Sequence, residues 1–220
     1  MFLTKENKFD LKRTLLWAAI TCVIVLLGVF TFDVPLFNLM RTFDCRFCDV
    51  MGVIFAAKTW LVVSAIVVFV FYIRKTIRAK SGFGLVDFYD KVRSSYAFLV
   101  FESVALASIT GAVLKFVIGR ARPIFYEAIG MTGFFPFTRD AAFHSMPSGH
   151  AMASFAGLIM IALLAPRGKW FLWALAILIG VSRICAGMHW PSDIIFGAFW
   201  GAMCACIVRA LTVRSHDFNK

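Results

Sequence analysis

Long apolar blocks are the feature that most restricts what this chain can fold into. The blocks cover residues 15–34, 53–73, 96–117, 148–165, 170–186 and 191–211. A helix needs about 20 apolar residues to cross the hydrocarbon core of a bilayer, because each residue adds about 1.5 Å. The sequence therefore predicts an all-α, polytopic membrane protein with six transmembrane helices in a helical bundle.

The composition agrees with a membrane location. Hydrophobic residues make up 61% of the chain and charged residues only 16%, and the mean hydropathy is +0.83. A soluble domain with this balance would have too little polar surface to cover itself. The length suits a single domain over residues 1–220. The short link at 166–169 predicts that the fourth and fifth blocks form an antiparallel hairpin.

The distribution of positive charge predicts the orientation in the membrane. The net charge is +11, and the basic residues gather in segments 1–14, 74–95, 166–169 and 209–220. With six spans these segments all face one side, which the positive-inside rule assigns to the cytoplasm together with both termini. Topology and headgroup contacts explain this charge, so nucleic acid is not expected as a partner. Segments 35–52, 118–147 and 187–190 are expected on the outer side.

Two cysteines lie close together in the first outer connection. Cys45 and Cys48 form the sequence Cys-Arg-Phe-Cys. An oxidising compartment would permit a disulfide between them, and the sequence leaves open whether it forms. Two cysteines are too few for a structural zinc site, which normally takes four protein ligands.

Three clusters of polar residues lie at the outer ends of the third to sixth blocks. The first cluster contains Lys115 and Arg122, seven residues apart and followed by Pro123. A helix that continued through both cations would place them on one face, and Pro123 would then end or redirect it. Taken alone, the two cations could be ordinary anchors that reach the membrane surface.

The second cluster is Pro-Ser-Gly-His at residues 147–150, directly before the fourth block. Ser148 is well placed to cap the helix, and Gly149 allows close approach of the backbone. The free N–H groups of a helix N-terminus also bind anions. His150 is expected in the first turn of this helix.

The third cluster joins the fifth and sixth blocks. It contains Ser182 and Arg183, then His189, then Pro191 and Asp193. Pro191 suits the first turn of a helix, which places Asp193 in the same turn with its carboxylate able to reach back towards His189. A carboxylate that holds one imidazole nitrogen fixes the tautomer and raises the basicity of the other nitrogen.

Together the three clusters contain the groups that phosphoryl transfer uses. They supply three cations, a serine hydroxyl, a helix N-terminus, two histidines and a carboxylate. The sequence has no carboxylate cluster for Mg²⁺ and no His-rich zinc set, so cations of the protein are expected to replace a metal, with no cofactor. Independent anchoring would not explain why all three clusters share one side of the membrane.

These residues resemble the type 2 phosphatidic acid phosphatase superfamily, which also includes vanadium haloperoxidases and bacterial class A acid phosphatases. The signature of that family is Lys-x6-Arg-Pro, Pro-Ser-Gly-His and Ser-Arg-x5-His-x3-Asp. All three parts occur here in order, at 115–123, 147–150 and 182–193. The match is specific but covers only the second half of the chain.

The resemblance implies a role for each matching residue. His189 would attack phosphorus and form a phosphohistidine, and Asp193 would orient it. His150 would protonate the leaving oxygen and then activate water. The implied phosphate-binding residues are Lys115, Arg122, Ser148, Gly149 and Arg183. Arg120 lies close by, but the family pattern does not require it.

The resemblance further implies a bacterial inner-membrane lipid phosphatase whose active site faces the periplasm. Lipids displayed on that side favour lipid A phosphate or undecaprenyl diphosphate as the substrate. Phosphatidylglycerophosphate and phosphatidate stay open as alternatives, as does a phosphotransferase that passes the phosphate to a second lipid. A lipid-phosphate binding or transport protein without catalysis is a further alternative, although pure binding would not need two histidines and a carboxylate. The sequence does not indicate an oligomeric state.

Overall fold

The computed structural model describes residues 2–4, 6–79, 84, 88–89, 92–93 and 95–218, with the backbone alone at 79 and 213–218. Four lysines that contribute to the predicted cytoplasmic charge lie outside the described residues: Lys5, Lys80, Lys91 and Lys220.

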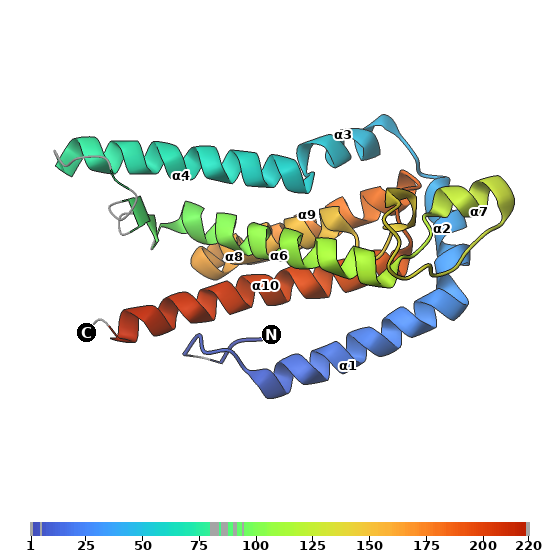
Figure 1. Ribbon diagram of the computed structural model, residues 1–220, viewed down its shortest axis with the longest axis horizontal. Helices are drawn as coiled ribbons and strands as arrows, with labels where there is room; N and C mark the ends of the chain where they lie inside the picture. Colours follow the sequence, from blue (N-terminus) through green and yellow to red (C-terminus); the bar gives the residue numbers. More distant parts are fainter. Residues whose placement is uncertain are drawn as a thin grey trace.

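The described chain is a bundle of helices (Figure 1). The long helices are α1 (Leu11–Leu27), which continues through a π-helical turn (Gly28–Phe32) into α2 (Asp33–Arg41), then α4 (Ala57–Ala79), α6 (Tyr96–Ile118), α8 (Gly149–Leu164), α9 (Lys169–Cys185) and α10 (Pro191–Phe218). The short elements are α3 (Arg46–Ile54), α7 (Pro123–Ile129) and two 3₁₀ turns, Ala141–Phe143 and Pro166–Gly168. The segments 35–52 and 118–147, predicted as connections, thus contain helices of their own.

Among the described residues, five helical runs are long and apolar enough to cross a membrane. They are Leu11–Arg41, Ala57–Arg78, Tyr96–Ile118, Pro166–Cys185 and Pro191–Thr212. The sixth, α8, is apolar but only 16 residues long. The predicted all-α, multi-pass membrane fold is confirmed.

The short helix α8 lies inside the bundle. It packs against α10, α6, α9 and α4, and most of its residues are buried. A helix enclosed by its neighbours does not have to match the full thickness of the lipid. Small residues permit this enclosure, because a Cβ at Gly201 of α10 would overlap the carbonyl oxygen of Met152 in α8.

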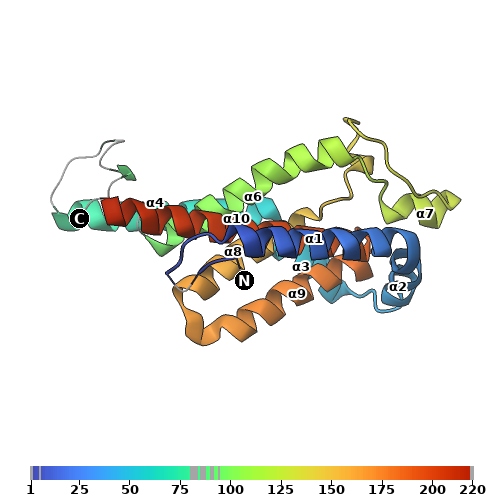
Figure 2. The same cartoon turned by 90° about the horizontal axis from the view of Figure 1, so that it is seen from below.

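Two views of the bundle show what lies at each end. The helices α2 and α7 lie at one end, and the C-terminus and the last turns of α4 lie at the other (Figures 1 and 2). The turn at Pro166–Gly168 joins α8 and α9 as a packed hairpin, as predicted. The N-termini of α8 and α10 and the C-terminus of α6 therefore meet near α2 and α7.

One expectation about the first polar cluster is wrong. The helix α6 ends at Ile118 instead of continuing to Arg122, because Gly119 adopts a φ of 58° and a Cβ there would overlap the carbonyl oxygen of Phe135. Pro123 then occupies the first turn of α7. Lys115 and Arg122 do not share a helical face, and the loop between them sets their relative positions.

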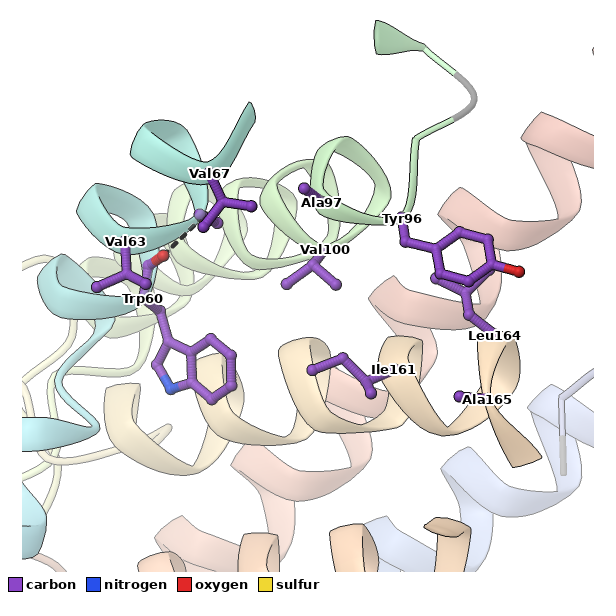
Figure 3. A pocket seen from close by; sticks show the side chains of 10 residues that line it. Trp60, Val63, Val67, Tyr96, Ala97, Val100, Ile161, Leu164 and Ala165 are labelled. Carbon is purple, nitrogen blue, oxygen red and sulfur yellow. Dashed lines mark hydrogen bonds between the residues drawn. The ribbon is translucent and has the colours of Figure 1, made fainter. Parts of the chain in front are cut away.

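An apolar pocket of about 310 Å³ opens between α4, α6 and α8 (Figure 3). Its wall runs from Trp60 past Val63 and Val100 to Tyr96. The hydroxyl of Ser64, which also lines the pocket, donates a hydrogen bond to the Trp60 carbonyl at 2.6 Å. The pocket therefore offers a mainly hydrocarbon surface within the membrane-spanning part of the bundle.

Candidate active site

The first turn of α10 holds a buried carboxylate beside a buried histidine. Asp193 accepts hydrogen bonds at Oδ2 from the Trp190 backbone N–H at 2.9 Å and from the Ser145 hydroxyl at 2.6 Å. Nδ1 of His189 lies 3.5 Å from the same oxygen. Both side chains are almost fully inaccessible to solvent. His189 lies just before α10, which begins at Pro191, and Asp193 lies in the first turn of that helix, so the two side chains are close together.

The surroundings of His189 favour its neutral form. Burial lowers the pKa of His189 to about 4, the charges of Lys115 and Arg122 act in the same direction, and Asp193 opposes them. The ring is therefore neutral at pH 7. A carboxylate on the Nδ1 side favours the tautomer with hydrogen on Nδ1, which leaves a lone pair on Nε2 for attack on an electrophile.

The N-terminus of α8 lies directly beside this pair. The backbone N–H of Ser148 donates to the Asp193 carbonyl at 3.1 Å, and the Ser148 hydroxyl accepts from the Ala151 N–H at 3.5 Å as the cap of α8. Gly149 is the first residue of α8, and a Cβ at that position would lie 3.8 Å from Cε of Lys115. A helix N-terminus, a hydroxyl and a lysine are therefore gathered at one place.

The two cations of the first cluster reach the site from the last turn of α6, which holds Lys115, and from the loop that follows it, which holds Arg122. The Lys115 ammonium donates to the His144 carbonyl at 2.8 Å. The Arg122 guanidinium donates to the carbonyls of Ala141 at 3.2 Å and Met188 at 3.3 Å, the latter next to His189. Arg122 is therefore bound to backbone next to His189, and Lys115 to backbone next to Ser145, which donates to Asp193.

The helix α3 supplies a further wall of the site, which the sequence analysis did not foresee. Nε2 of His150 lies 2.9 Å from the carbonyl oxygen of Gly52 in α3. The guanidinium of Arg183 packs so closely on Gly52 that a Cβ there would overlap it. Among the described residues Nη2 of Arg183 has no hydrogen-bond partner although it is buried, so this N–H group is available to an anion. His150 also lies within electrostatic range of Arg183, Lys115 and Arg122.

A second group of polar residues, to which the sequence assigned no role, lies behind Asp193. Nη1 of Arg120 donates to Asp193 Oδ1 at 2.7 Å and to the Ser192 hydroxyl at 2.7 Å. Nη2 of the same side chain donates to Asp33 Oδ2 at 2.6 Å. Burial acts to lower the pKa of Arg120, but the charges of Asp193 and Asp33 outweigh it and raise the pKa. The sequence did contain a signal for this group, namely Asp33 near the end of the first apolar block. A carboxylate in a membrane span is costly unless it is paired, so a buried partner could have been expected.

The Cys-Arg-Phe-Cys pair is present as two thiols. The Sγ atoms of Cys45 and Cys48 lie 3.7 Å apart at the start of α3. Burial raises the pKa of the Cys48 thiol to about 11, whereas hydrogen bonds from Cys48 lower the pKa of Cys45. No group of three or more metal-binding side chains occurs in the described part of the chain, and independence from metals stays a prediction.

Comparison with known proteins identifies the family. The model of the PAP2 superfamily matches residues 96–217, a region that contains all three polar clusters. The chain belongs to the PAP2 superfamily. It is therefore an enzyme of the PAP2 phosphatase family, as the three-part signature predicted.

Individual relatives agree with this membership. A lipid A 1-phosphatase from Rhizobium etli is 34% identical over 200 residues, which cover 89% of this chain and 83% of the relative. An undecaprenyl-diphosphatase from Sulfolobus acidocaldarius is 33% identical over 102 residues, 46% of this chain and 47% of that protein. The crystal structure of Aquifex aeolicus LpxE superimposes with a TM-score of 0.50 at 24% identity, covering 83% of this chain and 97% of that chain, and supports the fold.

The lowered pKa of His189 predicts a pH-dependent stability. Between pH 6.5 and 4 the unfolded chain binds a proton at this residue and the PAP2 fold does not, so the free energy of unfolding falls as the pH falls. From pH 7 to 4.5 this single group should cost roughly 2 kcal/mol. Unfolding of the wild type and of His189→Gln in detergent at the two pH values measures the effect. The variant should lose less stability than the wild type, and equal losses would contradict the buried, neutral histidine.

Proposed function

We propose that this PAP2 enzyme removes a phosphate from a membrane lipid, with the 1-phosphate of lipid A as the preferred substrate and undecaprenyl diphosphate as the second candidate. The observation that carries the proposal is the buried, neutral His189, which lies beside Asp193 and is bordered by Lys115 and Arg122. The similarity to a lipid A 1-phosphatase over 89% of the chain supports the first substrate. The match to an undecaprenyl-diphosphatase is shorter, at 46% of the chain.

The arrangement supports a two-step mechanism. In the first step Nε2 of His189 attacks phosphorus, the bond from phosphorus to the leaving lipid oxygen breaks, and His150 gives that oxygen a proton. In the second step His150 takes a proton from water, the water oxygen attacks phosphorus, and the bond to nitrogen breaks. The products are the dephosphorylated lipid and inorganic phosphate, and both histidines return to their starting forms.

Protein cations would stabilise the charge of the transferring group. Lys115, Arg122 and Arg183 would contact the phosphate oxygens, together with the Ser148 hydroxyl and the Gly149 N–H. The buried Nη2 of Arg183 supports this assignment because an anion would complete its hydrogen bonding. In this proposal no metal takes part in either step.

A direct test is phosphate release by the purified protein in detergent with EDTA present. The substrates are lipid A, undecaprenyl diphosphate, phosphatidylglycerophosphate and phosphatidate. The wild type should release phosphate from lipid A fastest, and His189→Ala should lower the rate by roughly a thousandfold or more because the covalent step is lost.

The matched control is His144→Gln, a second histidine whose ring contacts the Thr138 carbonyl within the loop. This variant should retain most of the activity. Loss of activity in EDTA that returns with a divalent cation would contradict the metal-free mechanism. A folded wild type that releases phosphate from none of the four lipids would contradict the proposed function.

We also propose that the site faces the periplasm in a bacterial inner membrane, with both termini cytoplasmic. The positive charge of segments 1–14, 74–95, 166–169 and 209–220 supports this orientation. A cysteine introduced at the exposed Arg139 should react in intact cells with a maleimide that cannot cross the inner membrane.

A position at the other end of the bundle, on the proposed cytoplasmic side, serves as the control for this labelling. A cysteine at the exposed Arg167, in the turn between α8 and α9, should react only after the cells are opened. Both substitutions are made after the natural cysteines are replaced. Labelling of position 167 but not of position 139 in intact cells would reverse the proposed topology.

A further inference from the structure

The side of Asp193 that faces away from His189 is occupied by a buried guanidinium shared between two carboxylates. Arg120 contacts Asp193 Oδ1 at 2.7 Å and Asp33 Oδ2 at 2.6 Å. The side chains of these three residues are at most 6% exposed. Asp33 comes from the first membrane-spanning run and Asp193 from the last, so the shared cation links the two ends of the chain at the candidate active site.

The backbone of the first span is shaped to bring Asp33 to this position. The π-helical turn Gly28–Phe32 directly precedes Asp33, which begins α2. Turns of this kind insert an extra residue into a helix and redirect the side chains that follow. A Cβ at Gly28 would lie 2.9 Å from Cβ of Ser192, so the turn packs closely on the start of α10.

Both side-chain oxygens of Asp33 accept hydrogen bonds from residues that adjoin or contact Asp193. Oδ1 accepts the backbone N–H of Ser192 at 2.9 Å, and Oδ2 accepts both the Ser192 hydroxyl and the Arg120 guanidinium. Asp33 therefore fixes the residue directly before Asp193 as well as the cation that contacts Asp193. The two oxygens of Asp193 are divided in the same way, because Oδ1 faces Arg120 and Oδ2 lies near His189.

The charge balance indicates more than a packing role. By themselves, two carboxylates and one guanidinium carry one net negative charge, which is expensive to maintain in a low-dielectric interior and which the attraction of Asp193 to Lys115 and Arg122 offsets in part. An Arg120–Asp193 pair alone would be neutral, although the Ser192 N–H and hydroxyl would then lose Asp33 as their acceptor. With Asp33 present, the positive charge of Arg120 is shared, and Asp193 keeps more of its negative charge for the imidazole of His189.

Asp33 is placed to act through Arg120 and Asp193 and not on the substrate. Asp33 and Arg120 line a cavity of about 260 Å³ with Val29, Phe134 and Trp190. None of the eight predicted catalytic and phosphate-binding residues is part of the described lining of this cavity. We propose that Asp33 is a positioning residue for phosphoryl transfer, acting through Arg120 on Asp193 and thereby on His189; this inference rests on the proposed phosphatase function.

The test is Asp33→Asn, which keeps the shape of the side chain and the Arg120–Asp193 pair but removes one charge. We expect kcat for phosphate release to fall by roughly ten- to a hundredfold, the usual cost of losing an outer partner of an active-site group, with KM changed less than about twofold. Inhibition by orthovanadate, which mimics the transition state, should weaken by a similar factor, whereas inhibition by phosphate should not. A purely structural role would change both inhibition constants alike or neither.

The matched control is Glu102→Gln, which neutralises another carboxylate within a membrane-spanning helix, at the edge of a different cavity. This variant should keep the wild-type kcat and the wild-type vanadate inhibition. Wild-type kcat and vanadate inhibition in folded Asp33→Asn would overturn the proposal.

A second variant covers the case in which Asp33→Asn does not fold. The variant Arg120→Lys keeps one positive charge between the two carboxylates, but an ammonium group lacks the two separate nitrogens by which the guanidinium contacts Asp33 and Asp193. It should show the same selective loss of kcat and vanadate inhibition, because Asp33 acts through this guanidinium, and wild-type values would overturn the proposal. Failure of the phosphatase function itself would be seen separately, as a wild type without phosphate release.

Discussion

The structure depends on one buried carboxylate at the start of α10. Asp193 receives hydrogen bonds from Arg120, from Ser145 and from the Trp190 backbone, and His189 lies beside it. Its own backbone carbonyl accepts the N–H of Ser148 at the start of α8. A buried ion of this kind is stable only when its partners are complete. The ends of α6, α8 and α10 are therefore held together by the same group that orients the candidate nucleophile.

The membrane explains why the buried polar groups of the candidate site lie together at one end of the bundle, beyond the apolar spans. Ionisable side chains are costly in hydrocarbon and are found where they pair with one another or meet water. Here the apolar wall of the cavity between α4, α6 and α8 contrasts with the charged end near α2 and α7. This separation would let a lipid keep its acyl chains in the bilayer while its phosphate reaches the cations.

Much of the fold and site could be predicted because the signals are local. Apolar length identified the helices, and His189 lies only four residues before Asp193, so the local chain geometry brings the two together. The end of α6 at Gly119 was missed, since it depends on the carbonyl of Phe135 in a loop. The contact of Asp33 with Arg120 spans 87 residues, and only the three-dimensional packing reveals it.

The central claim is that His189 carries the phosphate during turnover. The most direct measurement is to mix the enzyme with lipid A for milliseconds, quench in alkali, and locate any protein-bound phosphate by mass spectrometry. The account predicts an acid-labile phosphate on the imidazole of His189, absent in His189→Ala and formed more slowly in Asp193→Asn. Phosphate on another residue, or steady release of phosphate with no phosphoenzyme at any time point, would contradict it.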